Sequence, residues 1–312
     1  MRILFMGTPQ FALNSLRRLL DAGENVVGIV TQPDRPRGRG KIITPPPVKA
    51  FAQERDLVVY QPQTLRDLTV LKQLRDLGPE LIVVVAYGKI LPREILNLPP
   101  HGCINIHASL LPRYRGAAPI QWALLKGEEV TGVTSMYMSE GLDEGDIILQ
   151  SEVAILPTDT MGSLHDKLAC TGAELLLETV AKIKSGTAPR IPQPEKGVSF
   201  APPLDRSHQL INWGNPAPHI WYQVRALNPR PGATTYWQGS VLKVWDVAPR
   251  VENGEKHDLG EVVAVDKEEG ILVQTGKDLL QLKVLQPAGR RKMSASDFAR
   301  GYGIREGVIL GK

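Results

Sequence analysis

The strongest constraint on the fold is an unbroken apolar run at residues 81–86, Leu-Ile-Val-Val-Val-Ala. A short run rich in β-branched residues, without alternating polar positions, is typical of a strand buried on both faces. Further strands are expected at residues 3–6, 26–31 and 103–108, and amphipathic segments separate several of them. Because this alternation is characteristic of α/β proteins, it predicts a doubly wound, Rossmann-like parallel-sheet domain.

The first helix is expected to start directly after the first strand. Thr8 can serve as its N-cap, with Pro9 at the first helical position, and Gly23 can end it. Further helices are expected at residues 48–54 and 67–77. Ligands of doubly wound sheets bind outside the carboxyl ends of the strands. A ligand site is therefore expected at residues that follow strands, namely Gly7-Thr8-Pro9, Tyr87-Gly88 and the segment after His107.

The second half of the chain differs from the first. Residues 187–203 are rich in proline and show no periodicity, which is typical of an extended linker. The short apolar runs that follow are separated by turns and predict a small antiparallel, oligonucleotide-binding (OB)-like β-barrel. Its elements are expected at residues 218–226 (helix), 234–237, 241–247, 261–265, 271–275 and 279–285 (strands), and 294–300 (helix). The 312 residues then divide into domains at 1–186 and 207–312 with a linker at 187–206.

Composition narrows the class of protein. The two cysteines, Cys103 and Cys170, have no paired spacing, so a disulfide framework is not expected. A reducing, cytoplasmic compartment is expected instead. The apolar run at the N-terminus is too short for a signal peptide or a membrane span, so no membrane association is expected. The formal charge of +4 fits a polyanionic partner without requiring one.

Several common motifs are absent from the sequence. No Gly-x-Gly-x-x-Gly follows the first strand and no phosphate-binding P-loop occurs, which argues against a nicotinamide dehydrogenase or a nucleoside triphosphatase. The six histidines include no His-x-x-x-His or His-Glu-x-x-His pattern, so no metal is expected. There is no Gly-x-Ser-x-Gly elbow of an acyl-serine hydrolase.

Two polar clusters could carry chemistry. Asn105 and His107 project from the same face of a predicted strand, near its carboxyl end, where a buried polar pair must be satisfied or functional. A structural, hydrogen-bonded role for this pair is as compatible with the pattern as a catalytic one. The second cluster surrounds Asp143 in a glycine-bounded turn, which ordinary turn chemistry also explains. Sequence spacing alone does not indicate that Asp143 approaches His107.

Basic residues gather in two places. Arg35, Arg37, Arg39 and Lys41 lie in one short segment with glycines, which predicts a mobile loop suited to phosphate contacts, although a solvated loop would look similar. The second domain adds Lys243, Arg290, Arg291 and Lys292. Phosphate contacts of this kind would position a nucleic acid without reading its sequence.

Longer blocks carry a family resemblance. They are Met6-Gly7-Thr8-Pro9, Thr31-Gln32-Pro33-Asp34-Arg35-Pro36, residues 84–92, residues 105–119, Gly141-Leu142-Asp143 and Leu285-Gln286-Pro287-Ala288-Gly289. The Asn-x-His motif with Ser-Leu-Leu-Pro marks the folate formyltransferase superfamily, and the flanking Arg-Gly-Ala-Ala-Pro and the second-domain block point to one member. Through these blocks the chain resembles the methionyl-tRNA formyltransferase family along nearly its whole length.

The resemblance implies a reaction and a catalytic triad. The donor would be 10-formyltetrahydrofolate, no metal would take part, and Asn105, His107 and Asp143 would be catalytic. An Asn amide and a protonated imidazole could stabilise negative charge on the formyl oxygen, as an oxyanion hole does. Asp143 could orient His107, favour its charged form and help to move the proton from the attacking amine towards the folate nitrogen that leaves.

The resemblance also implies binding residues. The folate site would be formed by Ser109, Leu110, Leu111, Pro112, Tyr87, Gly88 and Leu142, although core packing is an open alternative for Leu110 and Leu111. The basic loop would enter the acceptor arm of methionyl-initiator tRNA, with Arg39 as the leading contact. The basic residues of the second domain would bind tRNA as well. A monomer that serves translation initiation is expected.

Four other classes of protein share part of this pattern. A formyltransferase for glycinamide ribonucleotide or an amino sugar nucleotide would keep the same triad but would have no need for the basic loop and the barrel. A hydrolase that deformylates folate would likewise have no need for the basic loop and the barrel. A non-catalytic RNA-binding protein would leave the Asn105–His107 pair unexplained, and an aromatic RNA-recognition motif is absent. The missing glycine motif makes a nucleotide-cofactor oxidoreductase the weakest alternative.

Overall fold

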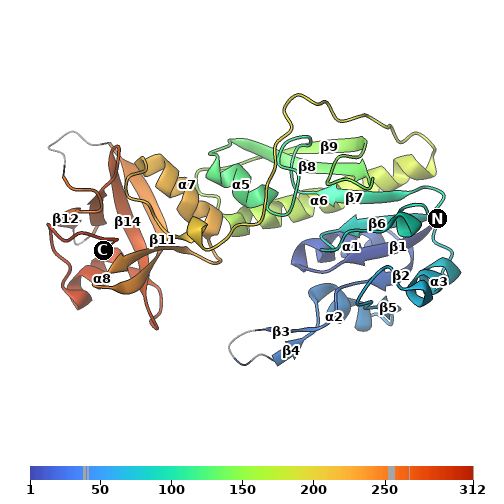
Figure 1. Cartoon of the computed structure of the whole chain (residues 1–312), viewed down its shortest axis with the longest axis horizontal. Helices are drawn as coiled ribbons and strands as arrows, with labels where there is room; N and C mark the ends of the chain where they lie inside the picture. The colour runs from blue at the N-terminus through green and yellow to red at the C-terminus, as the bar shows by residue number, and fades with distance from the viewer. Residues whose placement is uncertain (38–39, 41, 252–256, 267, 312) are drawn as a thin grey trace. The chain divides into compact units, whose positions relative to one another are not determined.

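The computed structural model describes residues 1–37, 40, 42–251, 257–266 and 268–311 (Figure 1). The chain divides into two compact units. Unit 1 contains Met1–Pro119, Val130–Ala154 and His165–Ala201, and unit 2 contains Ile120–Glu129, Ile155–Leu164 and Pro202–Lys312. Two short segments that interrupt unit 1 in the sequence thus group with the C-terminal unit.

Unit 1 is built on a seven-stranded sheet with the order β5-β2-β1-β6-β7-β8-β9. The strands are β1 (Arg2–Gly7), β2 (Asn25–Val30), β5 (Val59–Tyr60), β6 (Leu81–Val85), β7 (Cys103–His107), β8 (Val130–Tyr137) and β9 (Ile147–Ala154). The first five strands in this order pair in parallel, from β5 through β2, β1 and β6 to β7. Strands β8 and β9 add an antiparallel edge. All five residues of β6 are buried, so the predicted α/β fold with a central buried strand is confirmed.

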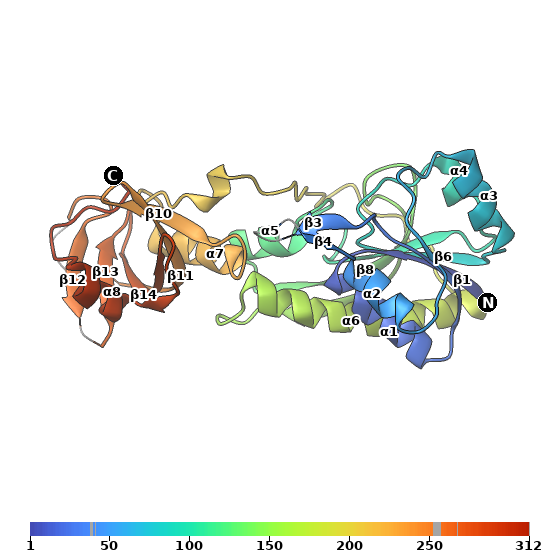
Figure 2. The same cartoon turned by 90° about the horizontal axis from the view of Figure 1, so that it is seen from below.

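Helices cover both faces of this sheet. Figure 2 shows α1 (Gln10–Asp21) and α6 (Met161–Lys184) on one face, and α3 (Leu68–Asp76) and α4 (Arg93–Leu96) on the other. The unit also contains α2 (Pro47–Gln53). Helix α5 (Pro119–Leu125) begins at the last residue of a unit 1 segment, and its other residues belong to unit 2. Neither α5 nor α6 was predicted. Within the described ranges, no helix is both long and apolar enough to cross a membrane.

The predicted N-cap of the first helix is wrong. Pro9 is the N-cap of α1, and no side chain caps this helix. The Thr8 hydroxyl donates instead to the carbonyl of Tyr87 at 3.0 Å and accepts from the Gln32 N–H. A long-range partner, which local sequence patterns do not reveal, has replaced the local cap.

Unit 2 is a small α+β unit with an antiparallel sheet, which confirms the predicted second fold. The sheet has the order β10-β11-β14-β13-β12, and β15 pairs with β14. Apolar side chains from the sheet, α7 and α8 form one core, including Val224, Val244, Leu282 and Phe298. The elements are η1 (Ser207–Gln209), α7 (Ala217–Leu227), β10 (Ala233–Trp237), β11 (Ser240–Arg250), β12 (Val262–Asp266), β13 (Gly270–Gln274), β14 (Leu279–Pro287), β15 (Met293–Ser294) and α8 (Ala295–Tyr302).

The proline-rich segment contains neither helix nor extended strand pairing, as expected, but its residues up to Ala201 belong to unit 1. Ile191 and Ile147 exchange two backbone hydrogen bonds, of 2.8 and 3.0 Å. Further along, Arg115 donates to the Ser199 carbonyl at 2.9 Å and accepts from the Ala201 N–H at 2.7 Å. The segment therefore runs along the loop that follows β7.

Candidate active site

The loop after β7 is anchored on the antiparallel edge of the sheet. The Thr134 hydroxyl of β8 donates to the Ser109 carbonyl at 2.7 Å and accepts from the Leu111 N–H at 3.1 Å. The Gln150 amide of β9 donates to the Leu111 carbonyl at 2.9 Å. These contacts fold the loop back, so that the carbonyl of Tyr114 reaches the His107 ring.

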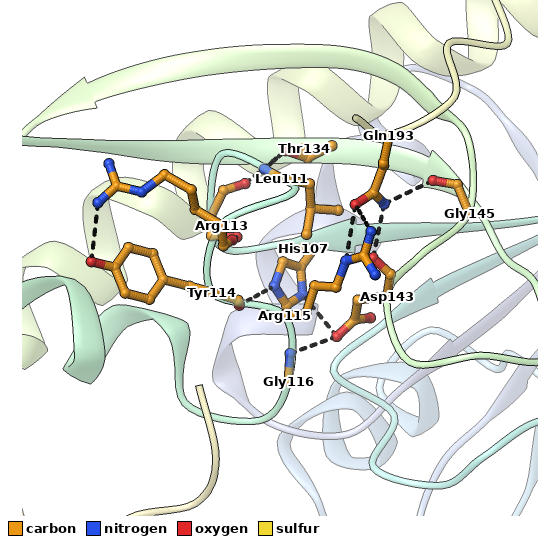
Figure 3. Close-up of polar contacts among 11 residues, drawn as sticks. His107, Leu111, Arg113, Tyr114, Arg115, Gly116, Thr134, Asp143, Gly145 and Gln193 are labelled. Atoms are coloured by element: carbon orange, nitrogen blue, oxygen red, sulfur yellow. Dashed lines mark hydrogen bonds and ion pairs between the residues drawn. The ribbon is translucent and has the colours of Figure 1, made fainter. Parts of the chain in front are cut away.

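His107 is buried, with 6% of its surface exposed. Its Nε2 lies 3.0 Å from the Tyr114 carbonyl oxygen, which can only accept, so Nε2 carries a proton and donates. Its Nδ1 lies 3.6 Å from Asp143 Oδ2 (Figure 3). That separation is too long for a hydrogen bond but short enough for an ion pair when the ring is protonated. Nε2 is therefore engaged by the loop, and Nδ1 is the ring nitrogen that faces Asp143.

Asp143 belongs to the loop between β8 and β9 and has a positive φ of 50°. Its carboxylate accepts a 2.9 Å hydrogen bond from the Gly116 N–H, and its backbone carbonyl accepts one of 2.8 Å from the Gln193 amide. Two contacts from other loops thus fix the side chain and the backbone of Asp143. The fold brings Asp143 to His107, an approach that sequence spacing left open.

Asn105 lies two residues before His107 on the same face of β7, in accordance with strand alternation. Its backbone pairs with Val84 and Met136, and its side chain is half-buried. Across the portion of the chain that the structure describes, no hydrogen bond uses its side-chain amide. Because this partly accessible amide has both donors and an acceptor to offer, Asn105 is suited to bind a ligand.

The turn after β6 is the second part of the candidate site. Thr8 and Gln32 both donate to the Tyr87 carbonyl, at 3.0 and 3.1 Å, and Gly88 has a positive φ of 84°. The Tyr87 side chain lies in the core, where burial raises the pKa of its hydroxyl to about 12. The turn can therefore offer a ligand its backbone and Gly88 rather than a phenol. Sequence analysis missed Gln32 as the residue that holds this turn.

The remaining expected folate residues differ in how accessible they are. Ser109 is fully buried and donates to the Arg113 carbonyl at 2.6 Å, and Leu111 packs against Met136 and Ile147. By contrast, Leu110 and Pro112 are half-buried, and Leu142 is 59% exposed. Ser109 and Leu111 thus shape the loop from inside, whereas the other three side chains can face a ligand.

The segment that was predicted to be a mobile basic loop contains part of a hairpin, and that prediction is wrong for Arg35 and Arg37. Strand β3 (Arg35–Arg37) pairs with β4 (Ile42–Thr44). The exposed Arg35 donates a long hydrogen bond of 3.4 Å to Gln32. Arg39 and Lys41 lie outside the described residues.

The hairpin is anchored at Asp34. Its carboxylate accepts from Lys49 at 2.7 Å and from the Gln61 amide at 2.7 Å. These hydrogen bonds lower the pKa of Asp34, so the carboxylate is ionised at neutral pH. Gln61 also donates to the Gln32 carbonyl, which connects the base of the hairpin to the turn that contains Tyr87.

Two of the four basic residues predicted to bind tRNA in unit 2 lie over the ring of Trp245. Lys292 lies over the indole ring at 3.5 Å from its centre, and Lys243 lies at 5.5 Å. Burial, and then the nearby charge of Lys243, lower the pKa of Lys292. Arg290 and Arg291 are exposed in the turn between β14 and β15. The structure therefore places Lys243 and Lys292 together, where an anion would relieve their repulsion, and Arg290 and Arg291 precede Lys292 in the chain.

Comparison with known proteins identifies the family. Residues 1–180 match the formyl transferase family, and residues 203–303 match the formyl transferase C-terminal domain. The methionyl-tRNA formyltransferase of Desulforamulus reducens is 50% identical over 311 residues, which cover 100% of this chain and 98% of the relative. That of Symbiobacterium thermophilum is 51% identical over 310 residues, 99% of this chain and 94% of the relative. The chain belongs to the methionyl-tRNA formyltransferase family.

Solved structures share the fold at lower identity. The structure of HypX from Aquifex aeolicus in complex with tetrahydrofolic acid has a TM-score of 0.63 and 20% identity, and covers 98% of this chain and 48% of HypX. The sugar 3N-formyl transferase WlaRD, crystallised with dTDP and 5-N-formyl-THF, has a TM-score of 0.67 and 18% identity, with 93% and 99% coverage. No group of three or more His, Cys, Asp or Glu side chains that could hold a metal occurs among the described positions.

Proposed function

We propose that this protein transfers the formyl group of 10-formyltetrahydrofolate to the amino group of methionyl-initiator tRNA, for translation initiation. Asn105, His107 and Asp143 are the catalytic residues of this proposal. The observation that carries it is the 3.6 Å approach of His107 Nδ1 to Asp143 Oδ2, with Asn105 on the same face of β7 two residues before His107. Full-length relatives of the same family, about half identical to this chain, support the choice of substrates.

Each residue has a role in the transfer. The methionine amine attacks the formyl carbon, a new C–N bond forms, and the bond from that carbon to the folate nitrogen breaks. The amine loses a proton and the folate nitrogen gains one. Asn105 and protonated His107 Nδ1 would donate to the formyl oxygen as it becomes negative. Asp143 would stabilise the protonated ring through the ion pair and pass the proton, directly or through water.

The folate fits the carboxyl-terminal edge of the parallel strands. The backbone of the turn containing Tyr87 and Gly88, with the accessible side chains of Leu110, Pro112 and Leu142, would surround the pterin ring. Ser109 and Leu111 would act indirectly, because their contacts are internal to the loop. The carboxyl ends of β6 and β7 carry these residues, as expected for an α/β sheet, except for Leu142, which lies in the loop between β8 and β9.

The tRNA would be bound by the two basic groups. Arg35, Arg37, Arg39 and Lys41 would enter the acceptor arm, and Lys243, Arg290, Arg291 and Lys292 would contact phosphates. The protein would act as a monomer in the cytoplasm, where charged initiator tRNA is used. Light scattering after size-exclusion chromatography tests the oligomeric state, because a monomer has a mass of 34.3 kDa.

The decisive experiment measures formyl transfer from 10-formyltetrahydrofolate to four acceptors. These are methionine-charged initiator tRNA, elongator methionyl-tRNA, free methionine and glycinamide ribonucleotide. Transfer to the charged initiator tRNA alone is expected. Transfer to a small amine without transfer to tRNA would keep the triad but contradict the proposed acceptor.

The triad is tested with single variants in the same assay. Asn105→Ala, His107→Ala and Asp143→Asn should each lower kcat by about two orders of magnitude, the effect of removing a charge-stabilising donor from an active site. Circular dichroism should show a folded chain for each. His101→Ala, at an exposed histidine before β7, is the control and should retain full activity. Near-wild-type turnover in any triad variant would remove that residue from the mechanism.

A further inference from the structure

We infer that Gln193, which lies in the proline-rich segment after α6, is a positioning residue that holds Asp143 in its catalytic geometry. The inference rests on the proposed role of Asp143. Gln193 belongs to none of the motifs that mark the site, and it enters the site from a segment expected to be only a linker. Its side-chain hydrogen bonds within the described part of the chain go to Arg115, Asp143 and Gly145, so it would act through Asp143 and not on the substrate.

Gln193 holds the backbone of the loop that contains Asp143. Its Nε2 donates to the carbonyl of Asp143 at 2.8 Å and to the carbonyl of Gly145 at 2.8 Å (Figure 3). Asp143 needs such support because its φ of 50° is uncommon for a residue with a side chain, and a strained backbone persists only where its surroundings hold it. The two hydrogen bonds fix the peptide group that follows Asp143 and the one that follows Gly145.

The other end of the Gln193 side chain holds the second loop of the site. Its Oε1 accepts from Arg115 Nε at 3.1 Å and from Arg115 Nη2 at 2.7 Å. Arg115 is followed by Gly116, whose N–H donates to the Asp143 carboxylate at 2.9 Å. Gln193 therefore connects the backbone of Asp143 to the loop that orients its carboxylate, and the contacts form a closed ring.

Only a glutamine makes all of these contacts. Its amide has two N–H donors and one oxygen with two lone pairs, and the four hydrogen bonds use this capacity completely. A glutamate would still accept from Arg115, as an ion pair, but would present an oxygen to the two carbonyl oxygens. An asparagine is one methylene too short to reach both loops. A residue selected only for packing or solubility would have no need for this donor and acceptor pattern.

The role predicts a specific kinetic signature. Without the amide donors, Asp143 would be misplaced relative to His107, and the 3.6 Å contact between the two side chains would be lost. Loss of an interaction that orients a functional group typically costs about 10- to 100-fold in activity. The loss should appear in kcat, whereas the KM values for folate and tRNA should change little, because the accessible binding residues do not contact Gln193.

The test is a double-mutant cycle with Asp143. Gln193→Glu and Gln193→Ala are each made in the wild-type chain and in Asp143→Asn, and kcat, both KM values and the midpoint of urea unfolding are measured. Each single variant should lose about 10- to 100-fold in kcat, and neither should add more than about threefold in Asp143→Asn, because the two residues act as one unit. Glu195→Gln, at an exposed position in the same segment, is the matched control and should leave kcat unchanged.

Each other result overturns the inference. Wild-type kcat in Gln193→Glu, or an equal loss in both backgrounds, would mean that Gln193 does not act through Asp143. A loss that follows the unfolding midpoint would assign it a purely structural role. Should Gln193→Ala fail to fold, Gln193→Glu decides alone, because it keeps the volume and the Arg115 contacts. Full activity in Asp143→Asn would instead contradict the proposed function, which separates the two failures.

Discussion

The backbone N–H of Gly116 donates to Asp143 Oδ2 at 2.9 Å, and the residue that makes this bond has no room for a side chain. Gly116 has a φ of 119°, a conformation that residues with a Cβ rarely adopt. A Cβ at this position would lie 2.9 Å from the Ala201 carbonyl oxygen. The segment that runs along the loop therefore restricts the position of the donor to Asp143.

Gly116→Ala should consequently impair both stability and activity. The strained φ and the clash with Ala201 should lower the free energy of unfolding by about 1–3 kcal/mol. Activity should fall at least about tenfold at a temperature where the variant is folded, because the donor to Asp143 shifts. Urea unfolding and formyl transfer measure the two effects. Gly186→Ala is the control, since Gly186 also has a positive φ, of 70°, but no atom lies near its missing Cβ; it should lose stability and keep its activity.

The anchor of the basic hairpin predicts a selective defect. Asp34→Asn and Lys49→Met each remove the ion pair at the base of β3, so both should raise the KM for charged tRNA several-fold. Folate binding, measured by fluorescence quenching, should be unaffected. Lys72→Met, at an exposed lysine of α3, is the control for loss of positive charge. An equal loss of folate and tRNA binding would indicate that the hairpin supports the folate turn instead.

The same anchor has a predicted pH dependence. Because its pKa in the folded chain lies below the ordinary 3.8, ionised Asp34 contributes stability that is fully present above that value. The contribution is lost only as the pH falls through the lowered pKa. The difference in unfolding midpoint between wild type and Asp34→Asn should therefore be constant from pH 6 to 9 and should shrink only in strong acid. A difference that changed near neutral pH would contradict this assignment.

The cations around Trp245 should contribute to tRNA affinity through phosphate contacts. Lys292→Ala and Lys243→Ala should each weaken tRNA binding. Each should also reduce the slope of log K against log salt by about 0.7 to 0.9, the counterion release expected for one phosphate contact. Filter binding at several salt concentrations gives the slope. Lys283→Ala, at an exposed lysine of β14, serves as the control. An unchanged slope in both variants would exclude direct phosphate contact.

The two cysteines should differ in reactivity. Cys103 is buried in β7, and burial raises the pKa of its thiol to about 12, so almost no thiolate is present at pH 8. Cys170 is exposed on α6. Iodoacetamide at pH 8 should therefore modify Cys170 in the native chain and reach Cys103 only after unfolding, as peptide mass spectrometry can show. Native modification of Cys103 would mean that β7 opens readily, and Cys170→Ser should abolish the rapid modification.

Local patterns of the sequence were sufficient for the fold class. The apolar run of β6 and the alternating segments around it predict a parallel sheet because burial on both faces requires continuous hydrophobicity. The short runs of unit 2 likewise predicted β10 to β14 close to their observed bounds. The helix α6 was missed because its apolar positions surround more than one side, so its amphipathic pattern is weak. Strand alternation identified Asn105 and His107 as polar residues on one face, but it did not distinguish a structural role from a catalytic one.

The contacts that make the pair a candidate active site depend on the tertiary structure. His107 meets Asp143 only because β7 and β8 are neighbouring strands, and Asp143 is held by Gly116 and Gln193 from two further segments. Thr8 likewise does not cap α1, because the fold brings the Tyr87 carbonyl within reach of its hydroxyl. Hydrophobic periodicity is a property of neighbouring residues, so a sequence displays it directly. Hydrogen bonds and ion pairs between distant residues depend on how strands and loops pack, and only the folded chain determines them.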